Sequence, residues 1–180
     1  MKRSERLIRN TVLAMAGAVV LLLGLGRLYA DDDREDEAPL RDFTAIEVEG
    51  EFSLEVVQGA DYSVAFTPAD RRDTHFDVRV RGKTLRLSGF RNPPGSLVQV
   101  ALPELKSLNA GRVRTLSVSG FSGAHLSLDV DTVPQVILRN NSVREWQIRA
   151  DRVADLQIDR ASMQASKVDL AGRATLTIIE

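Results

Sequence analysis

The sequence predicts an all-β fold, a parallel β-helix or β-roll of ten-residue strand units, preceded by one hydrophobic N-terminal helix. Three observations predict it: apolar residues alternate with polar ones through most of the chain, apolar residues recur every ten positions from about residue 113, and residues 11–26 form an uncharged apolar run. We therefore divide the chain into residues 1–30, a signal peptide or membrane anchor, residues 31–42, an acidic linker, and residues 43–180, a β-repeat domain.

The N-terminal segment has the charge pattern of an export signal. Four cations precede the apolar run, namely Lys2, Arg3, Arg6 and Arg9. A run of 16 residues (11 to 26) crosses a bilayer core only if the flanking arginines extend to the two interfaces. The small-residue rule for cleavage is half met by Leu28 and Ala30, so cleavage stays open and we favour an anchor through residues 11–28. Under either outcome the cations hold the N-terminus in the cytoplasm, which predicts an extracytoplasmic body, in the periplasm or at the cell surface.

Composition excludes several function classes. Residues 31–42 carry seven acids against two arginines, which is typical of a solvated, extended spacer. Residues 43–180 balance at 17 basic and 17 acidic side chains, so they lack the positive field that a nucleic-acid partner needs. The chain has no Cys, which excludes disulfides, thiolate metal sites and a lipidated cysteine. We expect no cofactor and no metal.

Short segments of period two indicate strands with one buried face in the first part of the body. The apolar positions are Phe52, Leu54, Val56; Tyr62, Val64, Phe66; Phe76, Val78, Val80; Leu85, Leu87; Val98, Val100, Leu102. Turn-forming residues separate these segments at 58–61, 68–73, 81–83 and 92–95. No segment after residue 30 has the period of a helix.

A ten-residue repeat continues from about residue 113 to the C-terminus. Positions ending in 8 are apolar in seven of seven units, those ending in 6 in six of seven, and those ending in 3 in five of seven. Each unit then supplies one short strand with two inward residues and a third apolar residue under the corner. The corner residues include Gly120, Gly123, Asn140, Asn141 and Gly172.

This repeat favours parallel stacking over an antiparallel meander, because the dipeptides of tight hairpins are absent at the unit boundaries. With two units per coil, parallel ladders join residues about 20 apart, and with three units, about 30 apart. Both counts stay open. The two-unit arrangement predicts one column of Val118, Leu138, Ile158 and Ile178, and a second of Leu128, Ile148 and Val168.

The chain resembles the putative auto-transporter adhesin head family, the GIN domain of bacterial extracytoplasmic proteins, over residues 41–130. The resemblance rests on four segments: Asp42–Gly50 (DFTAIEVEG), Val56–Gly59 (VVQG), Gly82–Leu87 (GKTLRL) and Val98–Leu108 (VQVALPELKSL). Past residue 130 the Ser-Gly corners of the family are mostly missing. The resemblance implies an extracytoplasmic β-domain with an adhesive role, and it implies no site residues.

Candidate catalytic groups all have simpler explanations. Asp129 and Asp131 could serve as the paired carboxylates of a polysaccharide-cleaving β-helix, but a solvated strand face explains them better. His75 and His125 have no partners for a metal site, and we expect both at the surface. Three serines lack a nearby histidine and acid in the sequence, namely Ser117, Ser119 and Ser122.

One group of cations could form an interaction face around Trp146, namely Arg139, Arg144, Arg149 and Arg152. Trp146 occupies an inward phase of the repeat, so we expect its burial. The arginines are then explained as a solvated face balanced by nearby aspartates. We expect a non-catalytic, membrane-tethered or secreted binding module with an unknown envelope protein or glycan as partner. A carbohydrate-active enzyme and a structural or sensory periplasmic appendage are the alternatives.

Overall fold

The computed structural model describes residues 40–67, 75–90, 94–159, 166–171 and 175–179, all within the compact unit Glu37–Glu180. The predicted anchor in residues 1–30 and most of the predicted linker lie outside the described residues. Within the described ranges, no helix has the length and apolar character needed to cross a membrane.

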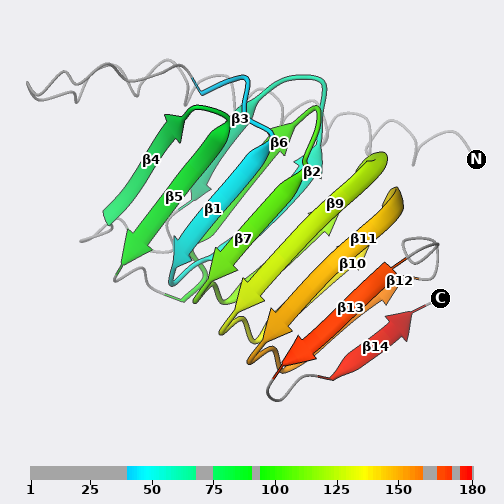
Figure 1. Ribbon diagram of the computed structural model, residues 1–180. Coiled ribbons are helices and arrows are strands. Elements are labelled where there is room, and N and C mark those ends of the chain that lie inside the picture. Colours follow the sequence, from blue (N-terminus) through cyan, green and yellow to red (C-terminus); the bar gives the residue numbers. More distant parts are fainter. Residues whose placement is uncertain (1–39, 68–74, 91–93, 160–165, 172–174, 180) are drawn as a thin grey trace, which may run out of the picture. The chain divides into compact units, whose positions relative to one another are not determined.

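The described residues form an all-β fold of fourteen strands in two mixed sheets (Figure 1). In chain order the strands are β1 (Ala45–Gly50), β2 (Ser53–Gln58), β3 (Ser63–Thr67), β4 (His75–Arg81), β5 (Thr84–Phe90), β6 (Leu97–Leu102), β7 (Ser107–Gly111), β8 (Thr115–Ser119), β9 (Ser122–Asp131), β10 (Gln135–Arg139), β11 (Ser142–Asp151), β12 (Asp155–Asp159), β13 (Ser166–Ala171) and β14 (Leu176–Ile179). Sheet A has the order β13-β11-β9-β7-β1-β5-β4, and sheet B has the order β14-β12-β10-β8-β2-β6-β3. From β7 onward the chain alternates between the two sheets.

Parallel ladders join residues 20 apart through the second half of the domain. Both predicted columns are present, Val118, Leu138, Ile158 and Ile178 in sheet B and Leu128, Ile148 and Val168 in sheet A. The predicted separation for two units is thus confirmed, and no ladder among the described residues joins positions 30 apart. From β9 onward, each strand therefore pairs with the strand two elements earlier in the chain.

The other end of the sheets departs from this parallel arrangement. Strand β4 pairs antiparallel with β5, and β3 pairs antiparallel with β6. The β4–β5 hairpin turns at Gly82, whose φ of 60° lies in the left-handed region that glycine adopts without strain. Strand β1 lies between β5 and β7, so that Ala45 faces Thr84 on one side and Ser107 on the other.

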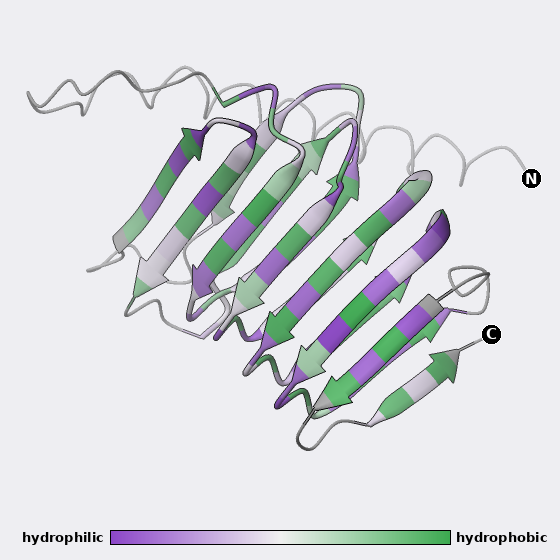
Figure 2. Cartoon of the chain, viewed as in Figure 1, coloured by the Kyte–Doolittle hydropathy of each residue, from purple (hydrophilic) through white to green (hydrophobic). Residues whose placement is uncertain are grey.

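The inward side chains of both sheets form one hydrophobic core. Residues whose numbers end in 6 or 8 are buried from Leu116 to Ile158, as the repeat predicts. Figure 2 shows how hydrophobic and hydrophilic residues alternate along the strands. The phase ending in 3 is buried at Val113, Val133, Val143 and Val153, but Gly123 is exposed. On β14 the equivalent residues are not buried: Leu176 is 36% exposed and Ile178 is 53% exposed.

Aromatic contacts close the core at the end formed by the two antiparallel edge strands. Phe66 of β3 stacks on Phe76 of β4, with ring centroids 4.5 Å apart and an interplanar angle of 16°. The ring of Phe76 also meets Phe52 edge-on, at a centroid distance of 5.6 Å. These contacts bridge the two sheets, so the antiparallel strands act as a cap on the parallel part of the domain.

Two sets of corners connect the sheets, and both depend on left-handed backbone conformations. Arg112, Thr132 and Arg152 have φ values of 56°, 57° and 53° at equivalent corners 20 residues apart. At the other corners, Gly120 has a φ of 81° and Asn140 a φ of 55°. The repeat therefore continues in the backbone of the corners even where the side chains differ.

A candidate binding groove on sheet A

The outer face of sheet A carries a charged surface on β4, β5 and β1, which continues onto the uncharged polar face of β7. Strand alternation directs Glu47 and Glu49 of β1 to solvent, while Val48 between them is buried. Glu47 faces Arg86 of β5 on one side and Asn109 of β7 on the other. The antiparallel strand β4 then places Arg79 directly opposite Arg86.

A groove of about 510 Å³ lies over these four strands. Its charged lining consists of three carboxylates and three guanidinium groups, namely Glu47, Glu49, Asp77, Arg79, Arg81 and Arg86. Between them lie the short side chains of Ser88 and Asn109, and Gly111, which has none. The volume falls within the range of about 300–1,000 Å³ that is usual for small-molecule sites.

Each carboxylate of the groove is paired with an arginine. Arg86 Nε lies 2.8 Å from Glu47 Oε2, and Arg79 Nε lies 3.1 Å from Asp77 Oδ2. Glu49 pairs with Arg112, which is at the adjoining corner. The side chains in these pairs are about half exposed, so the pairs contribute little to stability and serve mainly to orient their groups.

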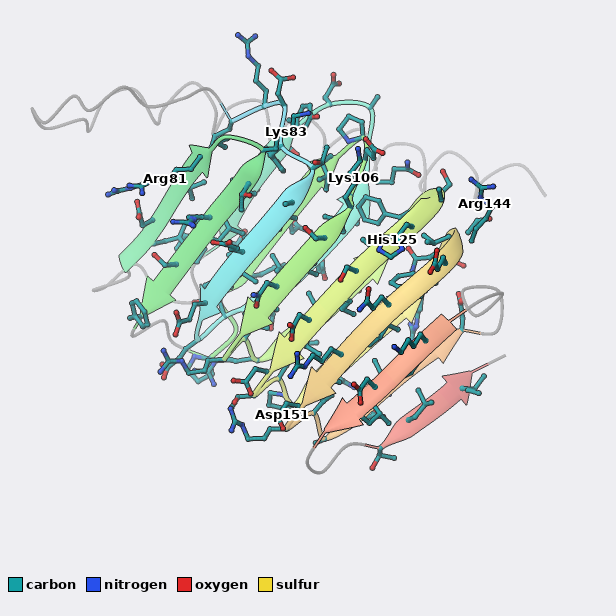
Figure 3. The ribbon with its side chains drawn as sticks, viewed as in Figure 1. Arg81, Lys83, Lys106, His125, Arg144 and Asp151 are labelled. Atoms are coloured by element: carbon teal, nitrogen blue, oxygen red, sulfur yellow. The ribbon has the colours of Figure 1, made fainter. Side chains whose placement is uncertain are left out.

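Arg81 differs from the other arginines of the groove. It forms no ion pair with any described residue, and its side chain extends from β4 into solvent (Figure 3). Its guanidinium group offers five N–H donors in a planar fork that matches a carboxylate or phosphate. The three carboxylates of the groove are therefore each neutralised by an arginine, and Arg81 adds a positive charge that no described carboxylate neutralises.

The described residues contain no group of three or more His, Asp or Glu side chains that could hold a metal ion. The groove also contains no histidine. Its chemistry is that of hydrogen bonding and charge pairing by arginine, carboxylate, hydroxyl and amide groups.

The two aspartates weighed as a catalytic pair lie outside the groove, on the exposed face of β9. Asp131 accepts a hydrogen bond of 2.7 Å from Arg152 Nη2, and Arg152 also donates to the Thr132 hydroxyl at 2.9 Å. Asp129 faces Asn109 on one side and Arg149 on the other. Both aspartates therefore belong to a solvated charged face, which agrees with the simpler explanation.

The remaining candidates are dispersed. His125 is exposed on β9, with Nδ1 3.7 Å from a carboxylate oxygen of Glu145, and the side chain of His75 lies outside the described residues (Figure 3). Ser117 and Ser119 lie on the outer side of β8 in sheet B, whereas Ser122 begins β9 in sheet A. No catalytic arrangement is formed by these side chains among the described residues.

The four arginines expected near Trp146 do not form one face. Arg139 lies on β10 in sheet B, whereas Arg149 lies on β11 in sheet A. Arg144 is near the start of β11, and Arg152 occupies a corner. Trp146 is 1% exposed, so its predicted burial is confirmed. Among the described residues, the buried indole has no hydrogen-bond partner for Nε1.

The sequence does not reveal the groove, because the β4–β5 hairpin meets β1 and β7, which are not its neighbours in chain order. Glu47 and Arg86 are brought together by the insertion of β1 between β5 and β7. The sequence does show that charged residues alternate with apolar ones on two of these strands. On β1 these are Glu47 and Glu49, and on β4 they are Asp77, Arg79 and Arg81. That pattern indicates a charged outer face without indicating which strands share it.

A family model described as "Putative auto-transporter adhesin, head GIN domain" matches residues 42–180. The chain belongs to this family. The match extends past residue 130, where the resemblance in the sequence fades, and it includes the strands whose corners lack Ser-Gly. The GIN domain thus comprises both the capped end with the groove and the parallel end with the ten-residue repeat.

Two solved structures are similar to this GIN domain. A putative adhesin from Bacteroides fragilis has a TM-score of 0.40 and 11% sequence identity, covering 79% of this chain and 94% of that chain. A putative adhesin from Parabacteroides merdae has a TM-score of 0.36 and 11% identity, covering 78% of this chain and 93% of that chain. No curated protein matches the sequence.

Proposed function

We propose that this GIN domain is a non-catalytic, adhesin-like binding module of the cell envelope, and that the groove on sheet A binds its ligand. The observation that carries the proposal is an open groove of about 510 Å³ with an uncommitted arginine, built on four paired strands. Strands hold such a surface rigid, so little conformational entropy is lost when a ligand binds. Membership of an adhesin-head family supports the same role.

The ligand that best suits the lining is a glycan with an anionic group. Arg81 supplies a charge-assisted contact for a carboxylate or phosphate, while Ser88 and Asn109 can hydrogen-bond sugar hydroxyls. The carboxylates of Glu47 and Asp77 already neutralise Arg86 and Arg79, so the net positive charge that a ligand meets in the groove is that of Arg81. A sugar with one anionic group is therefore favoured over a polyanion.

Pairing of the groove carboxylates favours binding over hydrolysis. A glycosidase needs one carboxyl group to donate a proton and a second to act as nucleophile or base. Here Glu47, Glu49 and Asp77 are each held in an ion pair with an arginine. Carboxylates that are already engaged by arginines suit a surface that orients a ligand better than one that cleaves it.

The location of the module follows from the N-terminal charge pattern. We propose that the strands stack as a β-solenoid outside the cytoplasm and that residues 11–28 tether it to the inner membrane. A tethered module exposes its sheets to the periplasm or the cell surface, where envelope glycans occur. The acidic segment before β1 would keep the module away from the anionic membrane surface.

Binding can be tested by filling the groove. An added Cβ at Gly111 meets Glu49 Cγ and the Val48 carbonyl at 3.9 Å, so a side chain there projects without displacing the backbone. We expect Gly111→Phe to abolish binding of the full chain to an array of acidic and neutral envelope glycans. Gly123→Phe is the matched control, because an added Cβ at exposed Gly123 meets nothing within 4 Å.

The expected pattern is binding of an acidic glycan by the wild-type chain and Gly123→Phe, with no signal for Gly111→Phe. Equal binding by all three chains would place the ligand site elsewhere on the molecule. Release of a reducing sugar from any bound glycan would contradict the non-catalytic part of the proposal.

A further inference from the structure

The edge strands at the two ends of the sheets differ in how well they cover the core. At one end the antiparallel strands β3 and β4 close the core through Phe66 and Phe76. At the other end β13 and β14 have a neighbour on one side in the described sheets, and both strands carry exposed apolar side chains. Leu170 is 39% exposed, Leu176 is 36% exposed and Ile178 is 53% exposed.

Strand β14 also lacks the features that usually protect a sheet edge. Its sequence, Leu-Thr-Ile-Ile, contains neither a charge nor a proline. An exposed edge of this kind offers a row of unpaired backbone groups together with apolar side chains in the core phase. Both requirements are met by another pair of strands that continues the two sheets.

The charges of β13 are complementary to those of a second, antiparallel copy of the same strand. Lys167 and Asp169 point outward on this strand, with Val168 between them on the inward side. If two copies of β13 pair antiparallel with Val168 on the two-fold axis, Lys167 of each copy lies directly opposite Asp169 of the other. Directly opposed charges of unlike sign stabilise a strand pair, whereas like charges destabilise it. Within the described part of β13, no other inward-facing centre brings these two residues together.

We propose that β13 and β14 form a self-association surface through which two copies of this chain pair end to end about a two-fold axis. The pairing continues sheet A through β13 and sheet B through β14 of each copy, and it covers Leu170, Leu176 and Ile178. A two-fold contact of this kind is closed, so it yields a dimer rather than a fibre. The capped ends with the binding grooves then lie at the two far ends of the dimer.

Disulfide cross-linking tests this geometry directly, because the chain contains no cysteine. In an antiparallel pair, directly opposed Cα atoms lie about 4.5–5.5 Å apart, which is within the range that a disulfide spans. We expect the full chain with Val168→Cys, oxidised in membranes, to give a dimer. Val78→Cys is the matched control, because Val78 is a partly buried inward valine on the opposite edge strand, β4.

Charge reversal tests the proposed register. In the Val168→Cys background, Lys167→Asp or Asp169→Lys alone places like charges opposite each other, and we expect dimer yield to fall about fivefold. The double change restores opposite charges and should restore the yield. Ile178→Asp should also prevent cross-linking, and its exposed position in one copy means that folding, followed by Trp146 fluorescence, should be retained.

Three results would overturn the proposal. Cross-linking of Val78→Cys to the same extent as Val168→Cys would indicate proximity without a specific surface. A product formed only when the two variants are mixed would indicate a head-to-tail chain of copies. Equal yields for the two single charge reversals and the double reversal would contradict the register about Val168.

Discussion

The side chain of Asn141 joins two successive corners, because its Oδ1 accepts a hydrogen bond of 3.0 Å from the backbone N–H of Phe121, 20 residues earlier. Its Nδ2 donates to the carbonyl of Val118, also at 3.0 Å. Asn141 is 1% exposed, so water does not replace these contacts. One amide side chain thus satisfies a backbone donor and a backbone acceptor at a corner where the strand ladder is interrupted.

Removal of this amide should destabilise the domain. We expect Asn141→Ala to lower the free energy of unfolding by about 1–3 kcal/mol, because it leaves the Phe121 N–H and the Val118 carbonyl without these partners. Urea unfolding followed by the fluorescence of Trp146, the single tryptophan of the chain, gives the measurement. Asn109→Ala is the control, since Asn109 is exposed on β7 and the same change there should have little effect.

The neighbouring residue tests the backbone conformation of the corner. Asn140 has a φ of 55°, which asparagine tolerates and β-branched residues strongly disfavour. We expect Asn140→Val to cost about 1–2 kcal/mol and Asn140→Gly to be close to neutral. Thermal unfolding of the purified variants measures both changes in stability. Similar melting temperatures for the two variants would show that this corner does not constrain the backbone.

Charges placed in the stacked columns should be far more damaging. Ile148 and Ile158 are each 1% exposed, so replacement of either by Asp buries a carboxylate without a partner and should cost several kcal/mol. Arg149→Ala and Gln157→Ala, at the adjacent outward positions, should change the melting temperature little. Comparable losses in all four variants would contradict the assignment of inward and outward phases.

The N-terminal charge pattern gives a prediction that does not depend on the sheets. Lys2, Arg3, Arg6 and Arg9 should hold residues 1–10 in the cytoplasm. Alkaline phosphatase fused after Glu180 should therefore be active, since that enzyme folds only outside the cytoplasm. Activity of a reporter that works only in the cytoplasm, fused at the same site, would contradict the charge argument.

The ten-residue phases were sufficient to predict pairing and burial in the parallel half of the domain. Val118 and Leu138 occupy equivalent positions of the repeat, and pairing of equivalent positions is the register that buries both side chains. Prediction was weaker at the ends. The phases at Leu176 and Ile178 continue unchanged, yet both side chains are exposed, because burial at an edge depends on a neighbour that periodicity does not supply.

The groove was not predictable for a different reason. One of its ion pairs joins β1 to β5 through Glu47 and Arg86, which are far apart in the sequence and outside the repeat. Alternation assigns a residue to a face, whereas strand order decides which residues on that face meet. Nothing in the local pattern of residues 43–102 indicates that β1 enters the sheet between β5 and β7.

Binding of an acidic envelope glycan by single charge-reversal variants tests the central claim most directly. Arg81→Glu reverses the uncommitted cation of the groove, and Arg139→Glu makes the same change at an exposed position on sheet B. The proposed groove predicts at least a tenfold loss of affinity for Arg81→Glu, the loss of one charge-assisted contact, and unchanged affinity for Arg139→Glu. Equal affinity of both variants and the wild-type chain would contradict it.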